Sequence, residues 1–217
     1  MGCYSMPELY DAVLNGNAKA AVEATRKALD AGANALELVS KEMVPAMDEV
    51  GRRFECEEYF VPELLLAARA MKGSLELIRP LLVESGAQPA GRVAIGTVKG
   101  DLHDIGKNIV AAMLEGGGFE VIDLGADVPA DKFVDAVRSR QANLVCLSAL
   151  LTVTMPSMKN TIEALSAAGV RDQVKVMVGG APVTKRFAEQ IGADGYSENA
   201  VAAVALARKL VAVHEAA

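Results

Sequence analysis

The strongest constraint on the fold is an alternation of short apolar runs with amphipathic segments, which begins near residue 92 and continues to the end of the chain. The apolar runs predict strands at Arg92–Val98, Phe119–Leu124, Asn143–Leu147, Val174–Val178 and Ala193–Tyr196. The segments between and after them predict helices at Ile105–Leu114, Ala130–Arg140, Met155–Ala168, Thr184–Ile191 and Asn199–His214. This order is typical of an α/β fold, a Rossmann/flavodoxin-like parallel sheet with helices on both faces. Ligands of such sheets bind at the carboxyl ends of the strands.

The first part of the chain has a helical pattern instead. Predicted helices cover Asp11–Leu14, Ala20–Leu29, Ala35–Gly51 and a segment from Pro62 to the region of Pro80. Short turns connect them, so we expect a small four-helix bundle. Small residues, Gly and Pro make Ser85–Gly91 a candidate linker, which predicts a helical domain at 1–88 and an α/β domain at 89–217.

Composition excludes several classes of protein. Lys and Arg number 22 against 28 Asp and Glu, a net charge of −6, and no basic stripe is present, which argues against nucleic acid as a partner. The three cysteines, Cys3, Cys56 and Cys146, form no CxxC pair, which argues against a disulfide framework or a structural zinc site. The chain has no secretory pattern at its start and no apolar run of about 18 residues, so we expect a cytoplasmic protein outside the membrane.

The first predicted strand leads into a loop, Gly100–Asn108, that contains a histidine. Its spacing differs from a phosphate-binding P-loop, and the dinucleotide fingerprint is absent. His103 could ligate a metal through one ring nitrogen, with Asp101 or Asp104 holding the other. The alternative is an ordinary loop in which Asp104 caps the next helix and His103 has no special role. The loop by itself leaves both interpretations open.

Two further loops follow strands of the same predicted sheet. Ser148, Thr152 and Thr154 crowd the loop after the third strand, and Gly179-Gly180 follows the fourth. Taken singly, the hydroxyls could cap a helix and the glycines could form an ordinary turn. Taken together, these loops predict a narrow slot along three neighbouring strand ends, lined by small and hydroxyl-bearing residues.

Three motifs in this order carry a specific resemblance. Asp101-x-His103-x-x-Gly106, then Ser148-x-Leu150 about forty residues later, then Gly179-Gly180 about thirty residues further on, are similar to the cobalamin-binding module of methionine synthase and of corrinoid proteins of methyltransferase systems. The resemblance extends over the helical part, so it covers nearly the whole chain. It implies a helical cap followed by a cobalamin-binding domain.

The resemblance implies a corrinoid bound base-off/His-on, with His103 as the lower axial ligand of its cobalt. Asp101 would accept a hydrogen bond from the other ring nitrogen, and Thr154 stands where the family often has a serine that extends this chain of contacts. These three residues would tune how strongly the ligand donates to cobalt. The remaining loop residues expected to contact the cofactor are Gly100, Leu102, Asp104, Ile105 and Gly106.

The nucleotide tail of the cofactor is expected in the slot. By resemblance, Ser148, Leu150 and Thr152 line it, and Gly179 and Gly180 provide room. Tyr196 matches a further stretch that contacts the tail, although it could equally be a core residue of the last strand.

The helical part resembles the family's cap. Phe54 and Val61 match apolar residues that cover the upper face of the corrin and exclude water. We expect Phe60 to belong to the bundle core instead. Glu55–Glu58 departs from the family pattern, which often has glycines there, and Cys56 is expected to be a packed or surface thiol.

By resemblance, the chain is a methyl carrier. It would accept a methyl group on Co(I) from a substrate-specific methyltransferase and pass it from methyl-Co(III) to a second methyltransferase, with tetrahydrofolate or a thiol coenzyme as acceptor. A reductive activase is a further expected partner. The chain is too short for a catalytic barrel, so it would be a carrier subunit rather than a free-standing catalyst.

Two alternatives use the same motifs: a cobalamin-dependent sensor or regulatory protein and a mutase-type domain. The photosensing members of the sensor class use a Trp and a His in the cap, and this chain has no Trp and no His in that region. The resemblance leaves open the methyl donor (methanol, a methylamine, a betaine or a methoxylated aromatic), the acceptor, the lower base and the oligomeric state.

Overall fold

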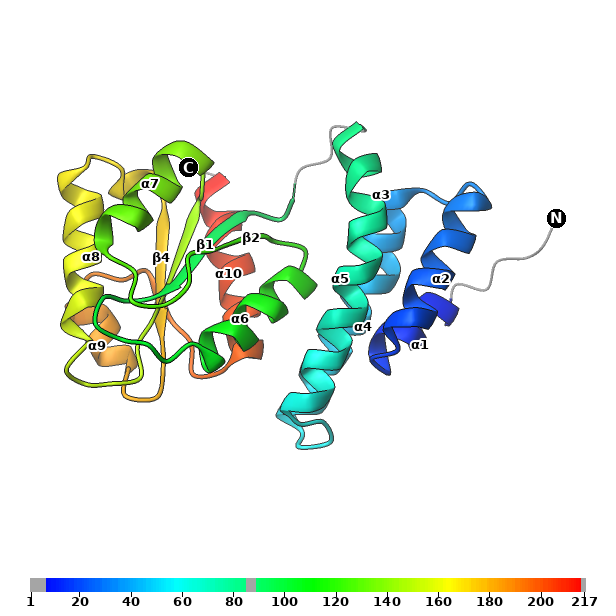
Figure 1. Cartoon of the computed structure of the whole chain (residues 1–217), viewed down its shortest axis with the longest axis horizontal. Coiled ribbons are helices and arrows are strands. Elements are labelled where there is room, and N and C mark those ends of the chain that lie inside the picture. The colour runs from blue at the N-terminus through cyan, green and yellow to red at the C-terminus, as the bar shows by residue number, and fades with distance from the viewer. Residues whose placement is uncertain (1–6, 85–88, 216–217) are drawn as a thin grey trace. The chain divides into compact units, whose positions relative to one another are not determined.

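A computed structural model describes residues 7–84 and 89–215, and the chain divides into two compact units (Figure 1). One unit is Met1–Pro89 with Glu115–Gly118, and the other is Ala90–Leu114 with Phe119–Ala217. We call them the helical domain and the α/β domain. Most of the expected linker lies outside the described residues, so the boundary between residues 88 and 89 stays a prediction.

The helical domain is built from the four predicted helical segments. Its elements are α1 (Pro7–Leu14), α2 (Ala18–Asp30), α3 (Ala35–Glu37), the π-helical η1 (Leu38–Met43), α4 (Val44–Glu55) and α5 (Val61–Glu84). Asparagines begin two of them: the Asn17 side chain accepts the Ala20 N–H, and that of Asn34 accepts the N–H groups of Leu36 and Glu37. These contacts satisfy amide groups that a helix start otherwise leaves unpaired.

Two features of this domain differ from the expected helices. The third segment contains a π turn, in which Leu38 and, four and five positions later, Glu42 and Met43 are buried. The fourth helix does not end near Pro80 but continues to Glu84, so that prediction was wrong. Pro80 and Glu76 lie on the exposed side, where a helix can open towards solvent without losing core contacts. No helix in the described ranges is both long and apolar enough to cross a membrane.

The α/β domain has the predicted alternation of strands and helices. Its elements are β1 (Arg92–Thr97), α6 (Ile105–Gly116), β2 (Glu120–Asp123), α7 (Ala130–Arg140), β3 (Leu144–Ser148), α8 (Pro156–Ala167), η2 (Arg171–Gln173), β4 (Lys175–Gly179), α9 (Lys185–Gln190), β5 (Gly195–Tyr196) and α10 (Ala200–Glu215). All described strand pairs are parallel, and the order is β2-β1-β3-β4-β5. This order is the flavodoxin-like one, which confirms the predicted fold class.

Helices cover both faces of the sheet (Figure 1). Phe133 of α7, Met158 of α8 and Ala188 of α9 share one core cluster with the strands, while α6 and α10 lie on the opposite face. Because β1 lies between β2 and β3, the loop after β1 is flanked by the loops that follow both neighbours. The chain direction of the crossovers reverses at this point, where such sheets bind ligands.

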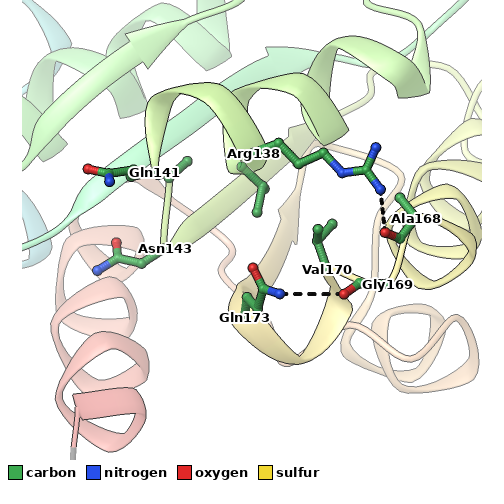
Figure 2. Close-up of a pocket in the computed structure, with 9 residues that line it drawn as sticks. Arg138, Gln141, Asn143, Ala168, Gly169, Val170 and Gln173 are labelled. Carbon is green, nitrogen blue, oxygen red and sulfur yellow. Dashed lines mark hydrogen bonds between the residues drawn. The ribbon is translucent and has the colours of Figure 1, made fainter.

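The opposite, amino-terminal edge of the sheet contains a hollow of about 510 Å³ between the ends of α7 and α8 (Figure 2). In it the Arg138 guanidinium donates to the Ala168 carbonyl, and the Gln173 side chain donates to that of Gly169. A cation bonded to the last carbonyls of a helix stabilises its end. The polar side chains that line the hollow therefore cap the end of α8.

Candidate functional site

The carboxylate of Asp101 lies between the loops that follow β1 and β3, at the carboxyl ends of the strands. Asp101 is fully buried, with 0% of its surface exposed. Its Oδ1 accepts the His103 N–H (3.0 Å) and lies 2.7 Å from His103 Nδ1. Its Oδ2 accepts the N–H groups of Leu150 (2.8 Å) and Leu151 (3.2 Å) and the Thr154 hydroxyl (2.7 Å). One side chain thus joins the loops after β1 and β3.

These contacts determine the ionisation of Asp101. Burial alone would raise its pKa, but hydrogen bonds from the His103 N–H, the Thr154 hydroxyl and the Leu150 N–H outweigh burial and hold the pKa well below its usual range. An ionised carboxylate only accepts hydrogen bonds, so Nδ1 of His103 carries the proton. In the neutral ring the other nitrogen, Nε2, then has a free lone pair and can coordinate a metal. The His103 side chain is half exposed, which leaves it accessible.

Three further polar residues support this edge, and sequence reasoning missed all of them. The buried Thr97 donates its hydroxyl to the His103 carbonyl (3.0 Å), and Asp127 accepts the N–H of the residue before Asp101. Lys107 is 2% exposed and lies 2.6 Å from both carboxylate oxygens of Asp123. The one available signal was position, because Thr97 and Asp123, which pairs with Lys107, each lie one residue before the end of a predicted strand at the ligand-binding edge.

Replacing Thr97 with valine should loosen the His103 loop while keeping the shape of the β1 end. Valine removes the hydroxyl that donates to the His103 carbonyl, and one such hydrogen bond contributes about 1 kcal/mol. We expect the free energy of unfolding, measured by urea denaturation, to fall by about that amount. Thr97→Ser is the matched control because it retains the hydroxyl, and equal losses in both variants would contradict the assignment.

The two glycines after β4 lie against backbone rather than open space. Gly180 has a φ of +128°, and a Cβ there would overlap the Ala149 carbonyl oxygen. A Cβ on Gly179 would come within 3.1 Å of the Ser197 carbonyl oxygen. Ser148, half-buried, uses its own carbonyl to accept the Val98 N–H. The glycines therefore allow neighbouring strand ends to approach closely. Their expected role of giving the nucleotide tail room stays a prediction.

Exposed apolar side chains, which we call the apolar rim, lie on the loops that contain His103 and Thr154. Leu102, Ile105 and Val153 are 75%, 78% and 80% exposed, and Leu150 and Leu151 are also exposed. They come from the same two loops that Asp101 joins. Apolar side chains that face solvent together on neighbouring loops indicate a surface that a ligand covers. This surface suits a large, flat, mostly apolar ligand lying over the imidazole.

Other predicted site residues are placed as follows. Gly100, Asp104, Gly106 and Thr152 are exposed on the same two loops or at the start of α6. Tyr196 of β5 is half-buried and packs against the core of the α/β domain, and its contact with the tail stays a prediction.

In the helical domain, Phe54 is half-buried near the end of α4 and Val61 is exposed at the start of α5. Phe60 is 62% exposed, so its predicted place in the bundle core was wrong. The Phe60 N–H donates to the Glu63 side chain (2.9 Å), a contact typical of the residue that caps a helix. The capping position projects Phe60 away from the core.

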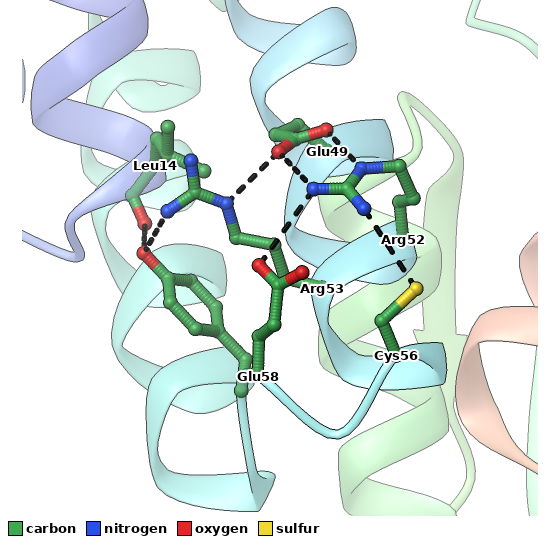
Figure 3. A network of polar contacts seen from close by, with 7 residues as sticks. Leu14, Glu49, Arg52, Arg53, Cys56 and Glu58 are labelled. Atoms are coloured by element: carbon green, nitrogen blue, oxygen red, sulfur yellow. Dashed lines mark hydrogen bonds and ion pairs between the residues drawn. The ribbon is translucent and has the colours of Figure 1, made fainter.

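A polar network fixes the turn between α4 and α5 (Figure 3). Glu49 accepts hydrogen bonds from Arg52 (2.7 and 2.8 Å) and from Arg53 (2.9 Å). These bonds lower the pKa of Glu49 to about 2. Arg53 also donates to the Tyr59 hydroxyl (3.0 Å), which in turn donates to the Leu14 carbonyl of α1 (3.5 Å). The network therefore holds the turn that separates Phe54 from Val61.

Both domains match models of a known protein family. Models described as B12 binding domain match residues 7–79 and residues 91–205, the second covering more than half the chain. The chain belongs to the B12-binding family. The two B12-binding matches correspond to the helical domain and the α/β domain, in the order that the resemblance implied.

Relatives in this family are similar over nearly the whole chain. Dimethylamine corrinoid protein 1 of Methanosarcina acetivorans is 45% identical over 203 residues, covering 93% of this chain and 91% of that protein. A crystal structure of a cobalamin-binding protein from Desulfitobacterium hafniense DCB-2 is 35% identical, with a TM-score of 0.76 and coverage of 95% and 98%. The methanol:cobalamin methyltransferase complex of Methanosarcina barkeri contains a chain 30% identical, with a TM-score of 0.84 and coverage of 95% and 79%.

The residues present fit a B12-type cofactor on structural grounds. A half-exposed imidazole has one nitrogen bonded to a buried carboxylate and the other free for a metal. The apolar rim suits the flat macrocycle around that metal, and the close backbone approach at Gly180 shapes the neighbouring loop. Within the described ranges, no group of three or more His, Cys, Asp or Glu residues is arranged to hold a metal ion.

Proposed function

We propose that this chain is a corrinoid-binding methyl carrier of a methyltransferase system. The observation that carries the proposal is the buried Asp101 carboxylate bonded to Nδ1 of the exposed His103, within an apolar rim. Relatives that are 45% and 46% identical are named dimethylamine and trimethylamine corrinoid proteins. A bound corrinoid supplies the cobalt that accepts and releases a methyl group.

In this proposal the corrinoid would be bound base-off/His-on, and His103 would hold its cobalt through Nε2. Asp101 fixes the tautomer and the direction of the ring, and it keeps the imidazole a strong donor. Thr154 bonds the other carboxylate oxygen and so completes a chain from the ligand to the β3–α8 loop. The remaining proposed contacts are Gly100, Leu102, Asp104, Ile105 and Gly106 for the ring, with Ser148, Leu150, Thr152, Gly179, Gly180 and Tyr196 for the tail.

Phe54 and Val61 are the proposed apolar contacts from the helical domain. Both lie beside the turn that the Glu49–Arg53–Tyr59 network holds. Their role would be to exclude water and oxygen from the reactive cofactor. A fixed turn would give these two side chains a defined position within their own domain.

The proposed partners are enzymes that supply and remove the methyl group. The solved methanol:cobalamin methyltransferase complex contains a similar chain, which supports a substrate-specific methyltransferase as the first partner. A second methyltransferase and a reductive activase complete the proposed cycle, and the cytoplasmic location belongs to the same proposal. The names of the relatives make a small methylated amine the first donor to test.

Reconstitution with cobalamin tests this function. We expect wild-type protein to retain cobalamin through gel filtration and to give reduced and then methylated spectra after a reductant and a methyl donor are added. His103→Ala should lose the spectrum of the imidazole-ligated form while circular dichroism stays unchanged, because only the ligand is removed. Loss of all cobalamin from the wild type would overturn the carrier function. A His103→Ala spectrum equal to wild type would overturn the axial role.

A further inference from the structure

The loop that carries His103 is also held from the β2 side, by Asp127. The Asp127 carboxylate accepts the Gly100 N–H (2.8 Å) and pairs with the Lys99 ammonium (3.0 Å). Its own N–H donates to the Asp101 carbonyl (2.9 Å). Asp127 therefore bonds the backbone on both sides of the Asp101 α-carbon, while the Asp101 side chain is bonded to the β3 side.

The backbone at Asp127 is adapted to these contacts. Its φ is +53°, in the left-handed region that Gly, Asn and Asp adopt more readily than other residues. On either side, the Thr97 N–H donates to the Gly125 carbonyl (3.0 Å) and the Val128 N–H donates to the Thr97 carbonyl (2.9 Å). The β2–α7 loop thus continues the backbone pairing with β1 beyond the sheet. It directs the carboxylate and the backbone N–H of Asp127 towards the β1–α6 loop.

We propose that Asp127 is a positioning residue, which fixes the backbone of Gly100 and Asp101 so that the Asp101 carboxylate holds the His103 ring in one orientation. The consequence for cobalt ligation rests on the proposed function. The positioning of Asp101 is a property of the chain alone, and it can be measured without a cofactor.

The contacts of Asp127 differ in how much they stabilise the loop. Lys99 is 62% exposed, so its ion pair contributes little. The bond from the Gly100 N–H to a charged oxygen is the stronger one. Asparagine can keep that acceptor and also tolerates the left-handed backbone, whereas glycine keeps the backbone and removes the side chain. Asp127→Gly and Asp127→Asn therefore separate the carboxylate's contact from backbone strain.

Amide hydrogen exchange in the protein without cofactor tests the proposal. The amides of His103 and Leu150 report on Asp101 directly, because they donate to its Oδ1 and Oδ2. In Asp127→Gly we expect both to exchange about tenfold faster, the loss expected for a hydrogen bond to a charged group. In Asp127→Asn the exchange rates of the same two amides should stay within about threefold of the wild-type rates. Amides inside β3, such as Val145, should not change.

Asp194 provides a matched control at the opposite edge of the sheet. Its carboxylate accepts the Val176 N–H (2.7 Å) and pairs with Arg171 (2.7 Å), the same combination of backbone and ionic contact. Asp194→Asn should leave the exchange of the His103 and Leu150 amides unchanged. Unchanged exchange at both amides in Asp127→Gly would overturn the positioning role. Equal acceleration throughout the sheet would also overturn it, because the effect would then be general destabilisation.

A second arm uses cobalamin-loaded protein. Asp127→Gly should lower the fraction of cobalt that is ligated by imidazole, which is read from the visible spectrum. Asp127→Asn should keep that fraction close to the wild-type value. His103→Ala gives the reference spectrum without that ligand. If His103→Ala matches wild type, the axial role fails while the exchange data still decide the role of Asp127. If His103→Ala differs and Asp127→Gly matches wild type, Asp127 does not position the ligand.

Discussion

Replacing Asp101 with alanine should lower the free energy of unfolding of the α/β domain by about 4 kcal/mol. The carboxylate is fully buried and accepts hydrogen bonds from three backbone N–H groups and the Thr154 hydroxyl, in addition to its contact with the His103 ring. Alanine would leave these donors without their partner in the protein interior. Urea denaturation followed by circular dichroism would measure the loss.

Two variants control this experiment. Asp101→Asn keeps the size of the side chain and one acceptor oxygen, but its NH₂ group faces donors, so we expect an intermediate loss. Asp135→Ala removes an exposed carboxylate whose described contact is the Ser139 hydroxyl, and it should change stability by less than about 0.5 kcal/mol. If Asp101→Ala loses no more unfolding free energy than Asp135→Ala, then water replaces the carboxylate and the stability of the loops does not depend on Asp101.

Replacing Gly180 with alanine should have an effect of similar size, about 4 kcal/mol. The new Cβ would overlap the Ala149 carbonyl oxygen, and the φ of +128° is one that residues with a side chain rarely adopt. The turn after β4 would have to move away from β3, which would disturb the proposed tail-binding loops. We therefore expect reduced retention of cobalamin as well as a lower unfolding midpoint, measured by gel filtration and thermal denaturation.

Gly192→Ala is the matched control for Gly180→Ala. Gly192 also has a positive φ, +74°, but its Cβ would have no neighbour within 4 Å. Its substitution should cost only the backbone strain, about 1 kcal/mol, and should leave cobalamin retention unchanged. Equal losses for the two variants would mean that the contact with Ala149 has no effect of its own.

The fold was predictable because the apolar runs that form a buried parallel sheet are visible in the sequence. The contact of Asp101 with His103 and Thr154 was implied by the family resemblance, and it agrees with the rule that loops after neighbouring parallel strands share one edge of the sheet. The contacts of Thr97 and Asp127 were not predictable, because they depend on backbone conformation, such as the left-handed φ at Asp127. No residue pattern specifies that conformation in advance.

The helical domain shows a different limit of sequence reasoning. Periodicity assumes an α-helix throughout, so it could not reveal the π turn at Leu38–Met43 or the continuation of α5 through Pro80. The expectation that Phe60 belongs to the bundle core was also wrong. Its position before α5, where its N–H bonds to Glu63, overrides the preference of its apolar side chain for the core.

The π turn has a consequence for how this domain is aligned with its relatives. Leu38 and Met43 both face the core although they are five positions apart, so the segment Ala35–Glu55 contains one residue more than an α-helix with the same buried side would need. A relative that lacks this residue could bury the same side chains with an ordinary turn. A single-residue gap between positions 38 and 43 would therefore record a change of helix type and not a change of fold.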